Sequence, residues 1–430
     1  MKRTFSIAMA FVGLTVGAGF ATGQEVIQYF VSFGLNGIWG AVLAGIVMTI
    51  AGSVILQVGS YFLADEHRMV FRNVAHPIVS RFLDVSVTLT LFAVGFVMLA
   101  GAGSNLEQQF GLPAWAGALI MTGVVLAAGM LDVKKVSQVI GALTPLIIVA
   151  VVFAFVYTMI NMPADTSHLS ETAMGEASPV SPWFLSALNY NGLALLLGVS
   201  MSLVIGGNYA SPKEAGLGGL MGGVLYTVML IIAAITLYLN IETVQGSDVP
   251  MLAMMDDISP VLGVIMAIII FFMIFNTAIG MFYALGKRLT ASTDKSFRPV
   301  FVVVTLIGYG ISFVGFETLM TYVYPVIGYI GMVMIAVMIA WWIRSRARIA
   351  LESKRRDRIH ELAHAREHEA EEYTEEDRKE MRKLVGESHI DDKTLHETIT
   401  DEVKDEIPDS DLEDASADSK DATARKVTDK

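Results

Sequence analysis

Long apolar runs separated by short polar segments fill the chain up to residue 343. Each run has roughly the ~20 residues that a helix needs to cross a bilayer. This pattern predicts an all-α membrane protein with ten transmembrane helices. The ten runs cover approximately residues 5–32, 37–63, 82–108, 114–131, 136–160, 182–208, 217–240, 259–285, 300–315 and 319–343.

The basic residues indicate how these helices are oriented. Up to residue 343, Lys and Arg occur only in alternate connections, and the connections 161–181 and 241–258 hold acidic residues without any Lys or Arg. Because cytoplasmic loops are enriched in Lys and Arg, we expect both termini in the cytoplasm and the chain in the inner or plasma membrane. The basic residues are Lys2, Arg3, Arg68, Arg72, Arg81, Lys134, Lys135, Lys213, Lys287, Arg288, Lys295 and Arg298.

The first run has an alternative explanation. Lys2 and Arg3 before an apolar stretch are also typical of a cleaved signal peptide. The apolar character continues to Phe33, beyond the length of a signal sequence, so we expect a retained span.

The ten runs divide into two sets of five whose members start about 180 residues apart. Since five is odd, the second set must be inverted in the membrane relative to the first. We therefore expect a transmembrane domain over residues 1–343, with repeat 1 at about 1–160 and repeat 2 at about 182–343.

The first run is rich in glycine at the depth where a helix should be most regular. Gly13, Gly17, Gly19 and Gly23 are followed directly by the polar pair Gln24-Glu25. Unwound backbone survives in a membrane only where protein or a water-filled cavity supplies hydrogen-bond partners. The sequence thus predicts a discontinuous first helix that lines a substrate pathway.

The sixth run contains comparable clusters, Asn189-Tyr190-Asn191-Gly192 and then Gly198 to Ser202. We predict that helix six is also broken and that its break faces that of helix one. Paired broken helices in inverted repeats are typical of secondary transporters with a site near the bilayer midplane. A third glycine-rich stretch, residues 216–223, is expected to serve close helix packing.

The run from Val16 to Glu25 resembles the signature of the YkvI family of bacterial membrane proteins, whose sixth helix typically has a Tyr and an Asn where Tyr190 and Asn191 stand. That family is similar to the amino acid-polyamine-organocation superfamily, which has the LeuT fold of five plus five inverted helices. The resemblance covers roughly residues 1–343. It implies a secondary transporter, not an enzyme, for a small organic solute such as an amino acid or a related amine.

Candidate substrate-binding residues follow from the expected breaks. Amides freed at the start of the half-helix near Phe20 would bind a substrate carboxylate at the positive end of the helix dipole. Phe92, Phe96 and Tyr190 would close over an apolar substrate side chain, although membrane aromatics more often face lipid or core. The full set is Val16, Gly17, Ala18, Gly19, Phe20, Phe92, Phe96, Tyr190, Asn191 and Gly192.

The resemblance to LeuT-like ion sites implies Na⁺ bound by the carbonyls of Gly13 and Val16 and by the side chains of Asn276 and Thr277. Oxygen ligands suit this hard cation. Asn276 and Thr277 are equally explained by hydrogen bonds between helices. The rival to Na⁺ is coupling to protons, with Glu25 as the group that titrates. The alternative for Glu25 is a position in the outer vestibule, without a role in coupling. No cofactor is expected beyond a coupling Na⁺.

Two features narrow the ligand class. The five tryptophans fall near span ends, where they anchor the interface, which argues against an aromatic cage for betaine or choline. No feature indicates nucleic acid, so the expected partners are a small-molecule substrate and the lipid bilayer.

The chain beyond residue 343 is highly charged, with 18 Lys or Arg and 26 Asp or Glu among residues 344–430. We expect a charged cytoplasmic helix at 344–385, its first arginines against lipid headgroups, and an acidic, mostly disordered tail at 386–430. His360-Glu361-Leu362-Ala363-His364 matches the zinc-peptidase pattern and His368 extends it, but a charged tail offers no third ligand or substrate cleft. We therefore expect a solvated helix face, and a tail that stays outside the transport mechanism.

Two other functions stay open. One is a transporter-fold sensor or scaffold that signals through the tail, and the other is a membrane-bound enzyme.

Overall fold

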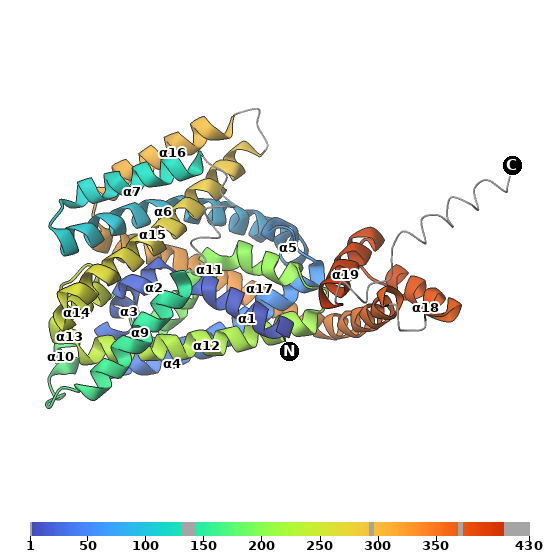
Figure 1. The fold of residues 1–430 in the computed structure, drawn as a ribbon, viewed down its shortest axis with the longest axis horizontal. Helices are drawn as coiled ribbons and strands as arrows, with labels where there is room; N and C mark the ends of the chain where they lie inside the picture. Colours follow the sequence, from blue (N-terminus) through green and yellow to red (C-terminus); the bar gives the residue numbers. More distant parts are fainter. Residues whose placement is uncertain (1, 131–142, 292–295, 369–372, 408–430) are drawn as a thin grey trace.

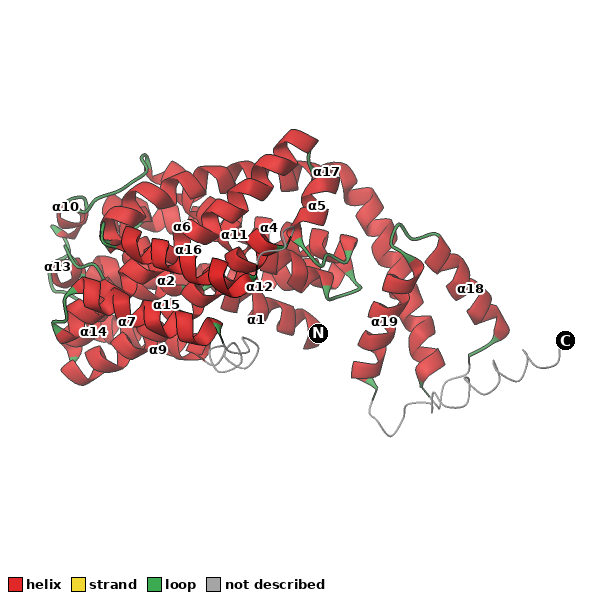
Figure 2. Cartoon of the chain, turned by 90° about the horizontal axis from the view of Figure 1, so that it is seen from above, coloured by secondary structure: helices red, strands yellow, loops and turns green. Residues whose placement is uncertain are grey.

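The computed structural model describes residues 2–130, 143–291, 296–368 and 373–407. Within these ranges the chain is helical and has no strand (Figures 1 and 2). Lys134, Lys135 and Lys295, the start of the predicted run 136–160 and the acidic end of the tail lie outside the described residues.

Helices occur at every predicted apolar run. Six of those in the described part are long and apolar enough to cross a membrane. They are α4 (Leu35–Phe62), α6 (Pro77–Phe110), α11 (Trp183–Gly207), α12 (Pro212–Leu239), α15 (Pro260–Thr290) and α17 (Phe316–Glu367). Three shorter apolar helices are α7 (Ala114–Gly129), α9 (Leu143–Ile160) and α16 (Phe297–Ser312).

Short helices fill the connections. α5 (His67–Val74) lies between α4 and α6, and α10 (Leu169–Ala173) precedes α11. α13 (Ile241–Val244) and α14 (Pro250–Ile258) join α12 to α15. In Figure 1 α7 and α16 lie together at one side of the bundle, while α18 (Glu375–Gly386) and α19 (Asp392–Glu406) project from one end.

The first helix is discontinuous, as predicted. It consists of α1 (Lys2–Thr15), α2 (Ala18–Thr22) and α3 (Gln24–Tyr29), followed by the short 3₁₀ turn η1 (Val31–Phe33). A second kink separates α2 from α3 at Gly23, whose φ of 81° is a left-handed conformation that favours glycine.

The predicted break in helix six is wrong. α11 runs without interruption through Asn189, Tyr190, Asn191 and Gly192. Its asparagines and glycine serve packing instead: Asn189 Nδ2 donates to the Pro325 carbonyl of α17 at 2.9 Å, and Asn191 Nδ2 donates to Ala187 O of its own helix at 2.9 Å.

Glycines make the contact between α11 and α17 unusually close. A Cβ atom on Gly331 would overlap the backbone of Gly192, and one on Gly192 would overlap the Gly328 carbonyl. Small residues let membrane helices approach closely, so this cluster marks a helix interface and not an unwound segment.

Residues 392–406 form a helix, where the sequence predicted mostly disorder. α17 continues without a break from the membrane-spanning part into the charged segment. α19 lies within the part that we expected to be mostly disordered, and its Leu395, Ile399 and Val403 are buried in a small core with Ile359 and Leu362 of α17. These apolar residues recur every four positions along α19, which gives that helix a face to bury.

Arg356 joins the tail to the membrane domain. Its guanidinium donates to the carbonyls of Ser60 (2.8 Å) and Tyr61 (2.7 Å) at the end of α4, and to Ala210 O (3.2 Å). Nε also donates to Glu352 at 2.9 Å. Arg356 is therefore buried in protein, whereas the sequence had indicated a position against lipid headgroups for this arginine cluster.

The N-terminal end of α1 is held by the same tail. Arg3 donates to the Glu402 carboxylate and to the Glu402 carbonyl, both at 3.0 Å, and also pairs with Glu406. The other carboxylate oxygen of Glu402 accepts from Ala210 N at 2.7 Å. The start of α1 and the tail helix α19 thus meet at one end of the bundle.

We predict that Gly331→Ala destabilises the bundle, because the neighbouring Gly192 backbone cannot move aside as a flexible side chain would. Overpacking of this kind typically costs ~1–3 kcal/mol. The measurement is the melting temperature of the purified protein. Gly123→Ala in α7 is the matched control, since a Cβ there meets nothing within 4 Å. Equal melting temperatures for the two variants would contradict the close contact.

We also predict that docking of α19 weakens as pH rises. Burial raises the pKa of Glu402 from 4.5 to about 7. The docked state therefore binds a proton more tightly than the undocked state. The stabilisation of the docked state by this proton is complete below pH 4.5 and is lost as pH rises through 7. Limited proteolysis in α19 should be slower at about pH 6 than at about pH 8. Glu402→Gln should remove this difference, and a variant that keeps it would refute the assignment to Glu402.

Candidate functional site

The break in helix one lies deep in the membrane domain. The 14 residues of α1 rise about 21 Å at ~1.5 Å per residue, so with Lys2 at the surface of a hydrocarbon core ~30 Å thick, Val16 and Gly17 lie well inside it. A Cβ atom on Gly17 would meet no atom within 4 Å, and Gly17 is half-buried. The unwound backbone therefore borders open space.

The break leaves carbonyl oxygens without backbone donors. Gly17 N donates to Thr15 O at 3.0 Å and not to Gly13 O, its regular helical acceptor. Within the described residues no backbone hydrogen bond reaches the carbonyls of Gly13 or Val16. These are the two oxygens that the sequence indicated for a cation.

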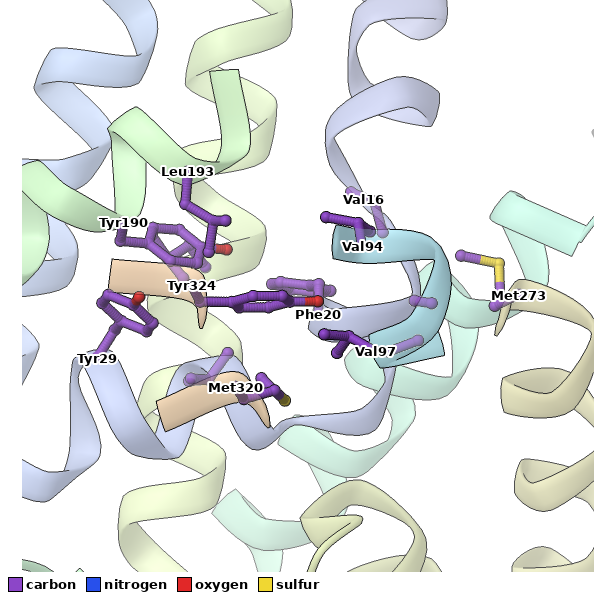
Figure 3. Packing of buried hydrophobic residues seen from close by; sticks show 14 of the residues in the cluster. Val16, Phe20, Tyr29, Val94, Val97, Tyr190, Leu193, Met273, Met320 and Tyr324 are labelled. Carbon is purple, nitrogen blue, oxygen red and sulfur yellow. The ribbon is translucent and has the colours of Figure 1, made fainter. Parts of the chain in front are cut away.

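Buried side chains from α2, α3, α6, α11 and α17 lie around the break. Figure 3 shows Tyr324 reaching from α17 toward Phe20, with Tyr29 and Tyr190 on one side and Val94 and Val97 of α6 on the other. Met320 lies one turn before Tyr324 on α17 and belongs to the same buried cluster.

Tyrosines form the polar part of this cluster. The hydroxyl groups of Tyr190 and Tyr226 hydrogen-bond to each other, and the rings of Tyr29 and Tyr190 lie 5.5 Å apart. The Tyr29 hydroxyl has no partner in the part of the chain that the structure describes. Tyr324 is fully buried.

Glu25 lies beside these tyrosines. Its side chain is 8% exposed, and no hydrogen bond or ion pair to it occurs among the described residues. The kink at Gly23 turns the carboxyl group back over α2, where a Cβ atom on Gly19 would overlap it. Tyr29 lies one turn after Glu25 on the same face of α3.

Several predicted substrate residues lie at this site and others do not. Val16, Ala18, Gly19, Phe20 and Tyr190 are buried around the break. The half-helix begins at Ala18, two residues earlier than predicted.

Gly192 faces α17, and the Asn191 amide nitrogen is bonded within α11, so neither borders an unwound segment. The rings of Phe92 and Phe96 pack edge to face with their centroids 5.4 Å apart, and Phe96 lies beside Gly308 of α16. The structure does not bring these two rings to Tyr190; Val94 and Val97 occupy the side of α6 that faces the break.

Asn276 and Thr277, the candidate sodium ligands on α15, do not form a cation site with the carbonyls of Gly13 and Val16 in the described structure. Thr277 is half-buried and donates its hydroxyl to Met273 O of its own helix at 3.1 Å. Asn276 is exposed and continues the stripe of exposed residues Ile265, Ile268 and Phe272.

Residues missed by sequence reasoning are Tyr29, Tyr226, Tyr324 and Met320. A signal for the two tyrosines Tyr226 and Tyr324 was present, since each places a hydroxyl group inside an apolar run, where polar groups are rare.

An acidic cavity of about 610 Å³ opens at the predicted outer end of the bundle. Its charged residues are all acidic: Glu107, Asp248, Asp256 and Asp257. α14 separates this cavity from the broken helix, because Leu252 lines the cavity while the neighbouring Met251 packs on Gly23.

The zinc-peptidase pattern has other contacts. His360 lies 3.3 Å from both Arg3 and Glu406, and Glu361 pairs with Arg358. The rings of His364 and His368 stack at 5.5 Å. In the described residues no group of three His, Cys, Asp or Glu side chains is arranged to hold a metal ion.

Comparison with known proteins gives relatives and a fold. No family model matches the chain. The membrane protein YkvI of Bacillus subtilis (strain 168) is 28% identical over 337 residues, which cover 77% of this chain and 94% of the relative. YyaD of the same organism is 23% identical over 337 residues, covering 78% of this chain and 96% of the relative.

Two solved structures share the architecture at low sequence identity. The crystal structure of MhsT in complex with L-phenylalanine matches with a TM-score of 0.58 and 15% identity, covering 91% of this chain and 97% of MhsT. A mutant form of the manganese transporter of Eremococcus coleocola matches with a TM-score of 0.51 and 12% identity, covering 94% of this chain and 95% of the transporter. The chain is a multi-pass membrane protein, a homologue of YkvI and YyaD, with the fold of the LeuT-type transporters.

Proposed function

We propose that this protein is a secondary active transporter of a small organic solute, an amino acid or a related amine. The observation that carries the proposal is the unwound backbone at Val16–Gly17, with unpaired carbonyls and open space at mid-membrane depth. Such backbone is tolerated where it lines a cavity. The shared fold supports the proposal, since the matched MhsT structure holds L-phenylalanine.

The proposed architecture is ten spans arranged as a 5+5 inverted repeat that works by alternating access. The solute would bind between helix one and α11, α6 and α17, at Val16 to Phe20 and Tyr190. Coupling to Na⁺ would use the free carbonyls of Gly13 and Val16, with Thr277 joining them when α15 approaches α1. Asn276, which lies on the exposed face of α15, would join them only if α15 also turned about its axis. Proton coupling through Glu25 is the alternative.

A second candidate function is a transporter-fold sensor that signals through the tail. One observation favours it: α17 is one helix of 52 residues that carries Tyr324 at the site and Ile359 and Leu362 in the tail core. A ligand that moved Tyr324 would act on a helix that reaches the tail directly.

The test is a thermal-stability screen of the purified protein against amino acids and amines, with and without Na⁺, followed by uptake of each stabilising solute into proteoliposomes. Ligands that bind the native state raise its melting temperature. A transporter accumulates the solute inside the vesicles under an ion gradient. Binding without accumulation would instead indicate a sensor.

We predict that Thr277→Ala reduces the stabilisation by NaCl, relative to KCl at equal ionic strength, more than it reduces stability in KCl. The reason is that the hydroxyl is one of few oxygen ligands for Na⁺, whereas its bond to Met273 O is local. Thr305→Ala is the matched control, because Thr305 makes the same kind of bond to Phe301 O within α16. Uptake driven equally well by a proton gradient without Na⁺ would overturn the prediction.

A further inference from the structure

Glu25 presents an uncompensated carboxyl group inside the membrane domain. It is more than nine-tenths buried, and the described part of the chain offers it no cationic or hydrogen-bonding partner. An ionisable group at this depth is costly, and such groups mark substrate or ion pathways. Its missing partner is therefore expected to come from outside the chain.

Unpaired oxygen atoms accompany Glu25 on α3. The side-chain oxygens of Gln24, Gln28 and Tyr29 are buried and have no hydrogen-bond partner among the described residues; the two amide oxygens only accept, and the Tyr29 hydroxyl can accept or donate. Glu25 and Tyr29 are four residues apart and so lie on one face of α3. A carboxylate and oxygen acceptors together call for a donor-rich ligand group, and an ammonium group has only donors.

The position of Glu25 disfavours a ligand carboxylate. The start of α2 is where a substrate carboxylate was expected from the sequence, but the Glu25 carboxyl group already lies on Gly19, the second residue of α2. Two carboxylates at one poorly solvated site repel each other. A solute without a carboxylate meets no such repulsion.

The acidic cavity carries negative charge, which is opposite in sign to an ammonium group. Glu107, Asp248, Asp256 and Asp257 line it, and its described lining contains no basic residue. A cleft lined by one sign of charge raises the local concentration of the opposite ion. α14 separates this cavity from Gly23 and Glu25.

We infer that the transported solute is a small organic amine without a carboxylate, whose ammonium group pairs with Glu25 and whose hydrocarbon body lies among Phe20, Tyr324 and Met320. This inference rests on the proposed function and names its substrate class. The aromatic rings of Phe20 and the tyrosines add attraction for a cation.

The experiment compares solutes that share one apolar body and differ only in charge. The first set is 3-methylbutylamine, leucine and 4-methylpentanoate, and the second is 2-phenylethylamine, phenylalanine and 3-phenylpropionate. Affinity for the full-length purified protein is measured by thermal shift and by titration calorimetry. We expect the amine of at least one set to bind most tightly.

Variants of Glu25 separate its role from that of the fold. Glu25→Gln should weaken amine binding by roughly ten- to a hundredfold, because a hydrogen bond to a charged group contributes more than a neutral one. Glu25→Asp should retain part of the affinity. Glu171→Gln, which removes an exposed carboxylate elsewhere on the outer side, should leave amine binding unchanged.

Tighter binding of leucine, phenylalanine or the two carboxylates would overturn the inference and leave the transporter proposal standing. So would amine binding that Glu25→Gln does not alter, including the case in which this variant loses only its response to NaCl or to a proton gradient. Amines that bind through Glu25 but never accumulate in proteoliposomes would instead support the site and refute the transport proposal.

Discussion

The fold depends on one constraint: in hydrocarbon, backbone and charged groups must find partners within the protein or its ligands. Most of the chain meets this constraint with regular helices. At Val16–Gly17 and at Glu25, polar groups lack such partners among the described residues. Buried rings from α11, α12 and α17 lie around these positions, and Met251 of α14 packs against Gly23.

Glycine has two opposite uses in this protein, and only the neighbours distinguish them. Gly17 borders open space beside an interrupted hydrogen-bond ladder. Gly192 lies in a continuous helix against the backbone of α17. In α12 the predicted packing role is confirmed, since Gly219 and Gly223 lie against the backbone of Gly52, Ser53 and Thr49 in α4. A glycine in a membrane segment thus indicates close approach as readily as a break.

This ambiguity explains what the sequence could predict. Helix positions follow from long apolar runs, and the helix-one break follows from glycines that directly precede Gln24 and Glu25. The supposed break in helix six failed because its partners, Pro325, Gly328 and Gly331, lie more than 130 residues away in the chain. Tyr226 and Tyr324 were detectable as hydroxyl groups inside apolar runs, but their meeting at one site depends on the same kind of long-range packing, which a local pattern does not specify.

The tail illustrates how charge can organise structure at a membrane surface. The last carbonyls of a helix lack internal donors and carry partial negative charge. Arg356 donates to Tyr61 O and to Ser60 O at the end of α4, where Ser60 O also accepts from Leu63 N, and it can do so because α17 continues as one helix into the charged segment. The small core with α19 then brings Glu402 to Arg3. Any displacement of the start of α1 must therefore either carry α19 along or separate Arg3 from Glu402, so the tail is mechanically linked to the helix that contains the break.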